Sequence, residues 1–203
     1  MLAETKARSQ LPALPCDCVL AFGIPTDEED FETSIKDPKR DYSKHYLAGW
    51  GQYRRNFVSQ VEDYTRRYEA LGVHVIRGLQ SSEIPALFTI GSVVTLFTHW
   101  TVAGVEFCDG ILSLPTLVEA VPCDFSGVLD LCVCHPDDLA ALLLRDRPLC
   151  TIRYLSNKAS PLFWLGFYAA LYELLALRRG RTYSEELTEL AIQLRHTGEG
   201  RPR

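Results

Sequence analysis

Two apolar segments of this chain end in residues that can carry out nucleophilic chemistry. The segment 92–100, SVVTLFTHW, ends at a histidine and a tryptophan, and the segment 127–136, GVLDLCVCHP, ends in two cysteines and a histidine. Counted from the first valine of each segment, His99 and Cys134 each lie six residues along the chain. If the segments are neighbouring parallel strands in step, both side chains emerge at one sheet edge, where open α/β sheets place their active sites. A thiol beside an imidazole suits nucleophilic catalysis, in which histidine takes the proton and the thiolate attacks a carbonyl carbon.

Cys132 is an alternative nucleophile. It has the same strand parity as Cys134, so both thiols are expected to point to the same side of the sheet. Cys132 lies one pleat deeper, whereas Cys134 is level with His99. The depth of the two cysteines therefore favours Cys134.

The same residue types are zinc ligands, and His135 follows Cys134 directly. Cys16 and Cys18 begin their predicted strand, whereas Cys132 and Cys134 end theirs. In a parallel sheet the two pairs lie a strand length apart, at about 3.3 Å per residue. The sequence also lacks the repeated CxxC spacing of many zinc sites. We therefore expect no metal and no other cofactor, and we expect His135 to precede a helix that opens with proline.

Composition and charge exclude several classes of function. Of 203 residues, 47% are hydrophobic and 23% are charged, which suits one soluble domain. The net charge is −5 and no basic stripe is present, so we expect no nucleic-acid partner. No apolar run approaches the roughly 20 residues of a membrane span, and the N-terminus does not resemble a signal peptide. Seven cysteines without a secretory signal indicate reduced thiols in a cytoplasmic protein.

The order of elements predicts an α/β fold with an open, mostly parallel sheet and helices on both faces. Residues 1–15 are predicted to be a flexible arm, 16–197 a single domain and 198–203 a frayed tail. The charged stretch 25–46 is predicted to be a surface loop. Asp109-Gly110 is predicted to be the turn of a small hairpin, and Ser184 to be the cap of the last helix. The predicted strands are 16–24, 73–79, 92–100, 127–134 and 148–155, and the main predicted helices are 50–71, 81–90, 137–145, 160–180 and 183–195.

Several motifs, taken in order, resemble those of caspase-like cysteine peptidases of the CHAT and separase-related branch. LFTHW (96–100) is similar to the family strand that ends in His-Gly, and LCVC (131–134) to the strand that ends in the nucleophilic cysteine. The likeness covers roughly residues 88–195. It also includes the turn and helix of CDGILSLPTLVEAVP (108–122), the helix start NKASPLFWLGFY (157–168) and the terminal helix YSEELTELAIQL (183–194).

The resemblance implies a caspase-like fold and a thiol protease with a His-Cys dyad that cleaves protein substrates. It maps the base onto His99 and the nucleophile onto Cys134. LDLC (129–132) is similar to the metacaspase motif and keeps Cys132 as the alternative nucleophile.

The resemblance also places Trp100, Arg153 and Tyr154 beside the substrate. Trp100 stands where the family has a glycine, so the indole is expected to reshape the site. Arg153 could receive an acidic P1 side chain by a bidentate contact. Asp130, which shares the parity of Cys132, would instead favour a basic P1 residue. The two alternatives predict opposite substrates and stay open.

Two other functions fit the same architecture. One is a nucleotide-sensing or TIR-like signalling module, although the chain has no GxGxxG or P-loop motif. The other is a caspase-like scaffold that has lost catalytic turnover, which the presence of Trp100 in place of the family's glycine would indicate. The family resemblance further implies a regulated effector in an antiviral defence or cell-death pathway, switched on by an activating protein or a small-molecule signal.

Overall fold

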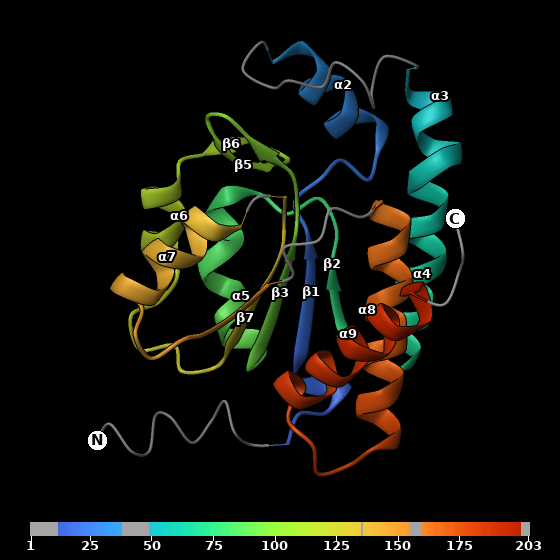
Figure 1. Cartoon of the computed structure of the whole chain (residues 1–203). Coiled ribbons are helices and arrows are strands. Elements are labelled where there is room, and N and C mark those ends of the chain that lie inside the picture. The colour runs from blue at the N-terminus through green and yellow to red at the C-terminus, as the bar shows by residue number, and fades with distance from the viewer. Residues whose placement is uncertain (1–11, 38–48, 135, 155–159, 200–203) are drawn as a thin grey trace.

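A five-stranded parallel sheet forms the centre of the molecule (Figure 1), in a computed structural model that describes residues 12–37, 49–134, 136–154 and 160–199. The strand order is β2-β1-β3-β7-β8, and every pair is parallel. The predicted α/β class, with an open sheet and helices on both faces, is confirmed. The strands are β1 (Cys18–Phe22), β2 (His74–Ile76), β3 (Val93–Phe97), β7 (Val128–Cys132) and β8 (Thr151–Tyr154).

Two layers of helices cover the sheet, one on each face (Figure 1). Strands that are buried on both faces need apolar residues at successive positions, as the sequence of the central strands has. Alternate side chains therefore enter two separate cores. We call the two sides the α8 face and the α7 face. The α8 face carries α4 (Ser59–Ala70), α8 (Pro161–Leu177) and α9 (Tyr183–Glu199), and the α7 face carries α5 (Ile84–Ile90), α6 (Leu114–Ala120) and α7 (Asp137–Asp146).

The helix predicted for residues 50–71 is present and contains one wide turn. It begins as α3 (Trp50–Tyr53), passes through a π-helical turn at Arg54–Val58 and continues as α4. Gly72 follows with a φ of 95°, the left-handed conformation that glycine adopts at a helix C-terminus.

The charged stretch predicted as a surface loop contains a helix, α2 (Glu28–Lys36). The Asp27 side chain accepts a hydrogen bond of 2.9 Å from the Asp30 N–H and caps this helix. Phe31 is buried, with its ring centroid 5.0 Å from that of Tyr53 and 5.5 Å from that of Trp50. The loop prediction was wrong because one buried aromatic residue, rather than a periodic stripe, anchors the helix. The remainder of that stretch, residues 38–46, lies outside the described residues.

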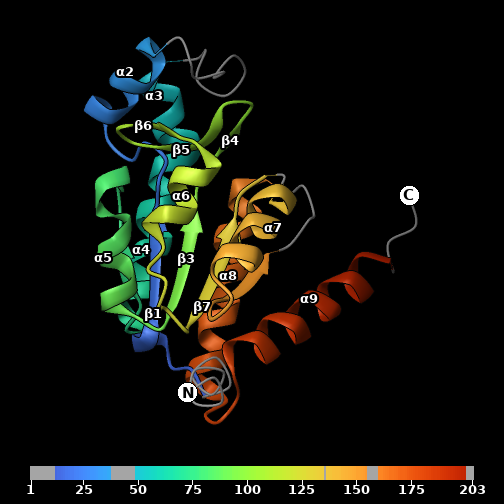
Figure 2. The ribbon, with the colours of Figure 1, turned by 90° about the vertical axis from the view of Figure 1, so that its left-hand side faces the viewer.

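Both ends of the predicted domain differ from the expectation. Ala13, placed in a flexible arm, is buried, and its N–H donates to the Arg181 carbonyl at 3.2 Å. The cap of α9 is Thr182 rather than Ser184, because the Thr182 hydroxyl accepts from the Glu185 N–H at 3.2 Å. Helix α9 continues to Glu199 and runs away from the sheet (Figure 2).

The predicted strand 92–100 is divided between two sheets. Its first part is β3, and after a break Trp100 begins a small antiparallel sheet in the order β4-β5-β6. The predicted hairpin is present, with Phe107 paired with Gly110 across the turn. This sheet stands over the carboxyl ends of the main strands (Figures 1 and 2). Its strands are β4 (Trp100–Thr101), β5 (Gly104–Phe107) and β6 (Gly110–Leu112).

Candidate active site

The carboxyl ends of β3 and β7 lie side by side. The two strands pair in parallel, with Phe97 opposite Cys132 as the last pair. A hydrogen bond of 3.2 Å from the Thr98 N–H to the Cys132 carbonyl extends the contact past the strand end. His99 and Cys134 each lie two residues beyond that pair. The strand register that the sequence predicted is therefore present.

Side chains alternate between the two faces of the sheet up to the ends of β3 and β7. Phe97 and Cys132 belong to the core on that face. Thr98 points away from it and donates from its hydroxyl to a carbonyl of β5, and Val133 is buried in the core of the α7 face. The period of two of an extended chain would return His99 to the α8 face, whereas Val133 and Cys134 form a bend, to which that period does not apply. His99 is half-buried and Cys134 is exposed.

Cys132, the last residue of β7, and Cys134, two residues beyond it, differ in their access to solvent. Cys132 is 8% exposed, and burial, followed by the nearby Asp130, raises the pKa of its thiol well above the ordinary value. A protonated buried thiol is a poor nucleophile. Cys134, two residues further on, is exposed. The structure therefore leaves Cys134 open to solvent and closes Cys132 off from it.

Asp130 lies in the core rather than beside a substrate. It is 1% exposed and accepts hydrogen bonds from the hydroxyls of Tyr183, at 2.6 Å, and Tyr168, at 3.2 Å. Burial raises the pKa of its carboxyl group to about 6, while the two hydroxyls and Arg153 act in the opposite direction. The expectation that Asp130 borders the substrate and selects a basic P1 residue is corrected by this burial. The parity argument was right, but the helices of the α8 face cover the position.

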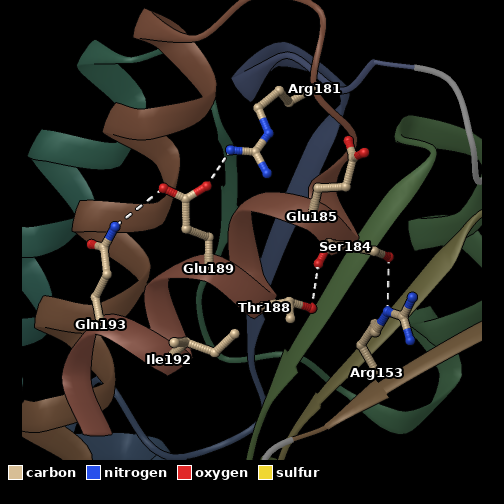
Figure 3. Close-up of a pocket in the computed structure, with 8 residues that line it drawn as sticks. All are labelled: Arg153, Arg181, Ser184, Glu185, Thr188, Glu189, Ile192 and Gln193. Carbon is tan, nitrogen blue, oxygen red and sulfur yellow. Dashed lines mark hydrogen bonds and ion pairs between the residues drawn. The ribbon is translucent and has the colours of Figure 1, made fainter. Parts of the chain in front are cut away.

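Arg153 lies deeper than the candidate nucleophile and points toward α9. It is paired with Asp130 in the sheet, and its Nε donates to the Ser184 hydroxyl at 2.7 Å (Figure 3). Cys134 is four residues beyond that level, and the last two of them lie past the end of β7. The hydrogen bond to Ser184 directs the Arg153 side chain to α9, whereas an acidic P1 pocket would require it beside Cys134. It lines an open groove of about 450 Å³ with Arg181, Ser184, Glu185, Thr188, Glu189, Ile192 and Gln193.

The two remaining predicted substrate contacts have different surroundings. Trp100 is half-buried and packs against the core of the α7 face. Tyr154 is exposed at the end of β8, opposite Leu131, whose side chain enters that same core. Both residues thus belong to the carboxyl edge, on its α7 side. His135 lies outside the described residues.

The cysteine pairs occupy opposite ends of the sheet. Cys18 is paired with Val93 at the start of β3, whereas Cys132 is paired with Phe97 at its end. All seven cysteines are free thiols. Within the part of the chain that the structure describes, no three or more His, Cys, Asp or Glu side chains are grouped to hold a metal ion.

A row of aromatic side chains on α8 was not anticipated. Phe163 stacks on Phe167 at a centroid distance of 6.3 Å, and Trp164 lies 6.5 Å from Tyr168. We call these four residues the aromatic row of α8. Tyr168 and Phe167 are buried, whereas Phe163 is 42% exposed. The sequence carries the signal as aromatic residues spaced four apart, which share a helix face.

The chain was also compared with known proteins. Comparison with models of protein families, with curated proteins and with solved structures finds no match. In the described residues, no helix has the length and apolar character needed to cross a membrane. A functional assignment therefore starts from the side chains at the carboxyl edge of the sheet.

Proposed function

We propose that this chain is a caspase-like cysteine endopeptidase, with Cys134 as the nucleophile and His99 as the general base. The observation that carries the proposal is the pairing of Phe97 with Cys132, because it brings the ends of β3 and β7 together in step. The open, parallel α/β architecture and the order of the motifs along the chain support the same assignment.

The proposed reaction has two steps. His99 takes the proton of the Cys134 thiol, and the thiolate adds to the carbonyl carbon of the scissile peptide bond. The C–N bond breaks as the imidazolium returns the proton to the leaving amine, which leaves an acyl group on the sulfur. A water molecule, deprotonated by His99, then attacks the thioester and releases the carboxylic acid and the thiol.

The exposure of the thiols supports Cys134 over Cys132 as the nucleophile. Attack requires both access and a thiolate, and burial withholds both from Cys132. The proposal extends to the compartment and the control of the enzyme. We place it in the cytoplasm, where its free thiols stay reduced. We place it in a defence or cell-death pathway under an activating protein or small-molecule signal, with the acidic helix α2 near the carboxyl edge as the candidate surface for that signal.

Peptide cleavage by variants of the individual cysteines tests the proposal. The full chain is incubated with a peptide library, and new N-termini are read by mass spectrometry. Cys134→Ala should abolish cleavage, whereas Cys132→Ala should retain most of it. Cys123→Ala is the matched control, because Cys123 is an exposed thiol before β7, far from the carboxyl edge.

Three other outcomes would contradict parts of the proposal. Loss of cleavage in Cys132→Ala alone would transfer the nucleophile to Cys132. If the wild type cleaves no peptide and Cys134 alkylates no faster than Cys123, the chain is a caspase-like scaffold without turnover. A thermal shift with a nucleotide, together with that result, would instead support the signalling module.

A further inference from the structure

We propose that the open edge of β8 and helix α9 together form a docking site for an extended peptide of a partner protein, which carries an acidic side chain opposite Arg153. The site is the groove of about 450 Å³ that Arg153 forms with α9 (Figure 3). It lies at the level of Asp130, below the strand end that precedes Cys134. The proposal therefore goes beyond the protease function and does not depend on it.

The backbone of β8 has hydrogen-bonding groups that its neighbour in the sheet does not use. β8 is the last strand in the sheet order, and among the described residues it pairs with β7 alone. The Thr151 N–H donates to the Gly127 carbonyl at 2.9 Å, so Thr151 and Arg153 direct their backbone groups toward β7. The N–H and C=O groups of Ile152 and Tyr154 therefore point to the open side. Such groups are a template for pairing with another extended chain.

Helix α9 supplies a wall beside this edge. Its first half packs on the core of the α8 face through Leu187 and Leu190, and its second half runs away from the sheet (Figure 2). Ser184, Thr188 and Ile192 are spaced four apart on the side of the helix that lines the groove, and Ile192 is exposed there. A chain paired with β8, about 4.8 Å from it, would lie along this wall.

The charged residues of the groove favour an acidic side chain in the peptide. Arg181 forms an ion pair with Glu189, and the Glu185 carboxylate accepts a hydrogen bond of 2.8 Å from the Thr182 N–H. Arg153 donates from its Nε, and within the described residues its two terminal nitrogens make no hydrogen bond or ion pair. These nitrogens can bind a carboxylate through charge-assisted hydrogen bonds.

The direction of the Arg153 side chain determines which peptide residue it meets. In a chain paired with β8, the residue directly opposite Arg153 points to the same face of the sheet. Its side chain therefore enters the groove between Arg153 and α9. Opposite charges on paired strands attract and like charges repel, so Asp or Glu is favoured at this position and Lys or Arg is disfavoured. The main-chain hydrogen bonds to Ile152 and Tyr154 supply affinity, as they do wherever a peptide adds a strand to a sheet.

Peptides selected for binding test the proposal. A random heptapeptide library displayed on phage is selected on the immobilised full chain, and the enriched peptides are synthesised with a fluorescent label for binding measurements by anisotropy. We expect these peptides to share one Asp or Glu that Lys cannot replace. At a concentration of about 100 times Kd, a bound peptide should slow hydrogen exchange of the Ile152 and Tyr154 amides about 100-fold. The amides of β2, at the other edge of the sheet, should exchange as before.

Variants of β8 test the charge and the backbone contacts separately. Arg153→Glu should weaken binding of the acidic peptides about 10-fold and shift the preference to Lys, because an attractive pair becomes a repulsive one. Arg77→Glu is the matched control, because Arg77 is an exposed arginine directly after β2. Tyr154→Pro should abolish binding, because it removes an outward N–H that β7 does not use, whereas Tyr154→Ala should retain most of it.

Several results would overturn the docking site. They are a selection that enriches no peptide, equal binding by the wild type and Arg153→Glu, and unchanged exchange of the Ile152 and Tyr154 amides. A dimer in sedimentation, with these two amides already protected, would assign the edge to a second copy of the chain instead. Cys134→Ala should bind the peptides as tightly as the wild type, so the docking site can stand even if the proposed protease function fails. Weaker binding by Cys134→Ala would mean that the peptides occupy the proposed substrate site.

Discussion

Replacement of Asp130 by asparagine should change how the stability of the protein depends on pH. The carboxyl group is 1% exposed and its pKa is about 6 in the folded chain, against an ordinary value of 3.8. Burial is the largest cause, and it disfavours the charged form. Asparagine has nearly the same shape and can still bond to the hydroxyls of Tyr168 and Tyr183, but it does not titrate.

The direction of the change in stability with pH follows from the number of protons bound by the folded and the unfolded chain. Between pH 3.8 and about 6 the folded chain holds a proton on Asp130 that the unfolded chain has lost, so the free energy of unfolding falls as pH rises. The stabilising contribution of the protonated group is complete below pH 3.8 and is lost once pH passes about 6. A difference of about two pKa units corresponds to about 3 kcal/mol. The wild type should therefore lose about 3 kcal/mol relative to Asp130→Asn between pH 3.5 and pH 7.

Urea unfolding followed by tryptophan fluorescence at several pH values measures this difference. The free energy of unfolding of the variant is subtracted from that of the wild type at each pH. This difference removes the contribution of the other carboxylates, which titrate in both proteins. Asp146→Asn is the control, because Arg145 lowers the pKa of the exposed Asp146 and gives that pair a pH dependence of opposite sign. A wild-type minus Asp130→Asn difference that stays flat from pH 3.5 to pH 7, or that rises, would refute the assignment of a raised pKa to Asp130.

Two further predictions concern the candidate dyad and its metal content. His99→Ala should keep the wild-type free energy of unfolding, because the residue is half-buried at a strand end, yet lower turnover by about 10² to 10⁴. It should also slow iodoacetamide labelling of Cys134 at pH 6 to 7, with His74→Ala on the exposed start of β2 as the control; unchanged labelling would mean that the two strand ends do not cooperate. Purified protein should contain no stoichiometric zinc, since the cysteine pairs lie at opposite sheet ends. One zinc per chain that is lost in Cys134→Ala would contradict both this expectation and the proposed protease function.

The features that could be predicted from the sequence are those that depend on short-range pattern. Continuous apolar runs bounded by turn residues identified all five strands of the main sheet, because strands buried on both faces tolerate few polar side chains. The register of β3 and β7 followed from equal numbers of residues to His99 and Cys134. The small hairpin followed from the turn at Asp109-Gly110, which permits a φ of 154° at Gly110.

The features that could not be predicted depend on partners far away in the chain. Helix α2 is held by contacts of Phe31 with Trp50 and Tyr53, and no periodic pattern of hydrophobic residues in its own sequence indicates these contacts. The predicted face of the sheet for the Asp130 side chain was correct, but its burial depends on Tyr183, which lies 53 residues later. The predicted strand 92–100 ended early because the Thr98 hydroxyl donates to the Glu106 carbonyl and the His99 carbonyl accepts from the Glu106 N–H, which bonds the chain to β5.

Depth along β7 accounts for the different roles of residues of similar chemistry. Asp130 and Cys132 share one face of β7 and lie about 7 Å apart, and Cys134 follows two residues beyond the end of the strand. At the deepest of the three positions, the Asp130 carboxyl group accepts hydrogen bonds from two tyrosines and links the sheet to α8 and α9. At the next position, burial keeps the Cys132 thiol protonated. Only at the last position is a thiol, that of Cys134, open to solvent. The same helix, α8, covers the first two positions, because its Tyr168 hydroxyl bonds to Asp130 and lies beside Cys132. Reactivity in this protein is therefore expected where the chain emerges from beneath that helix.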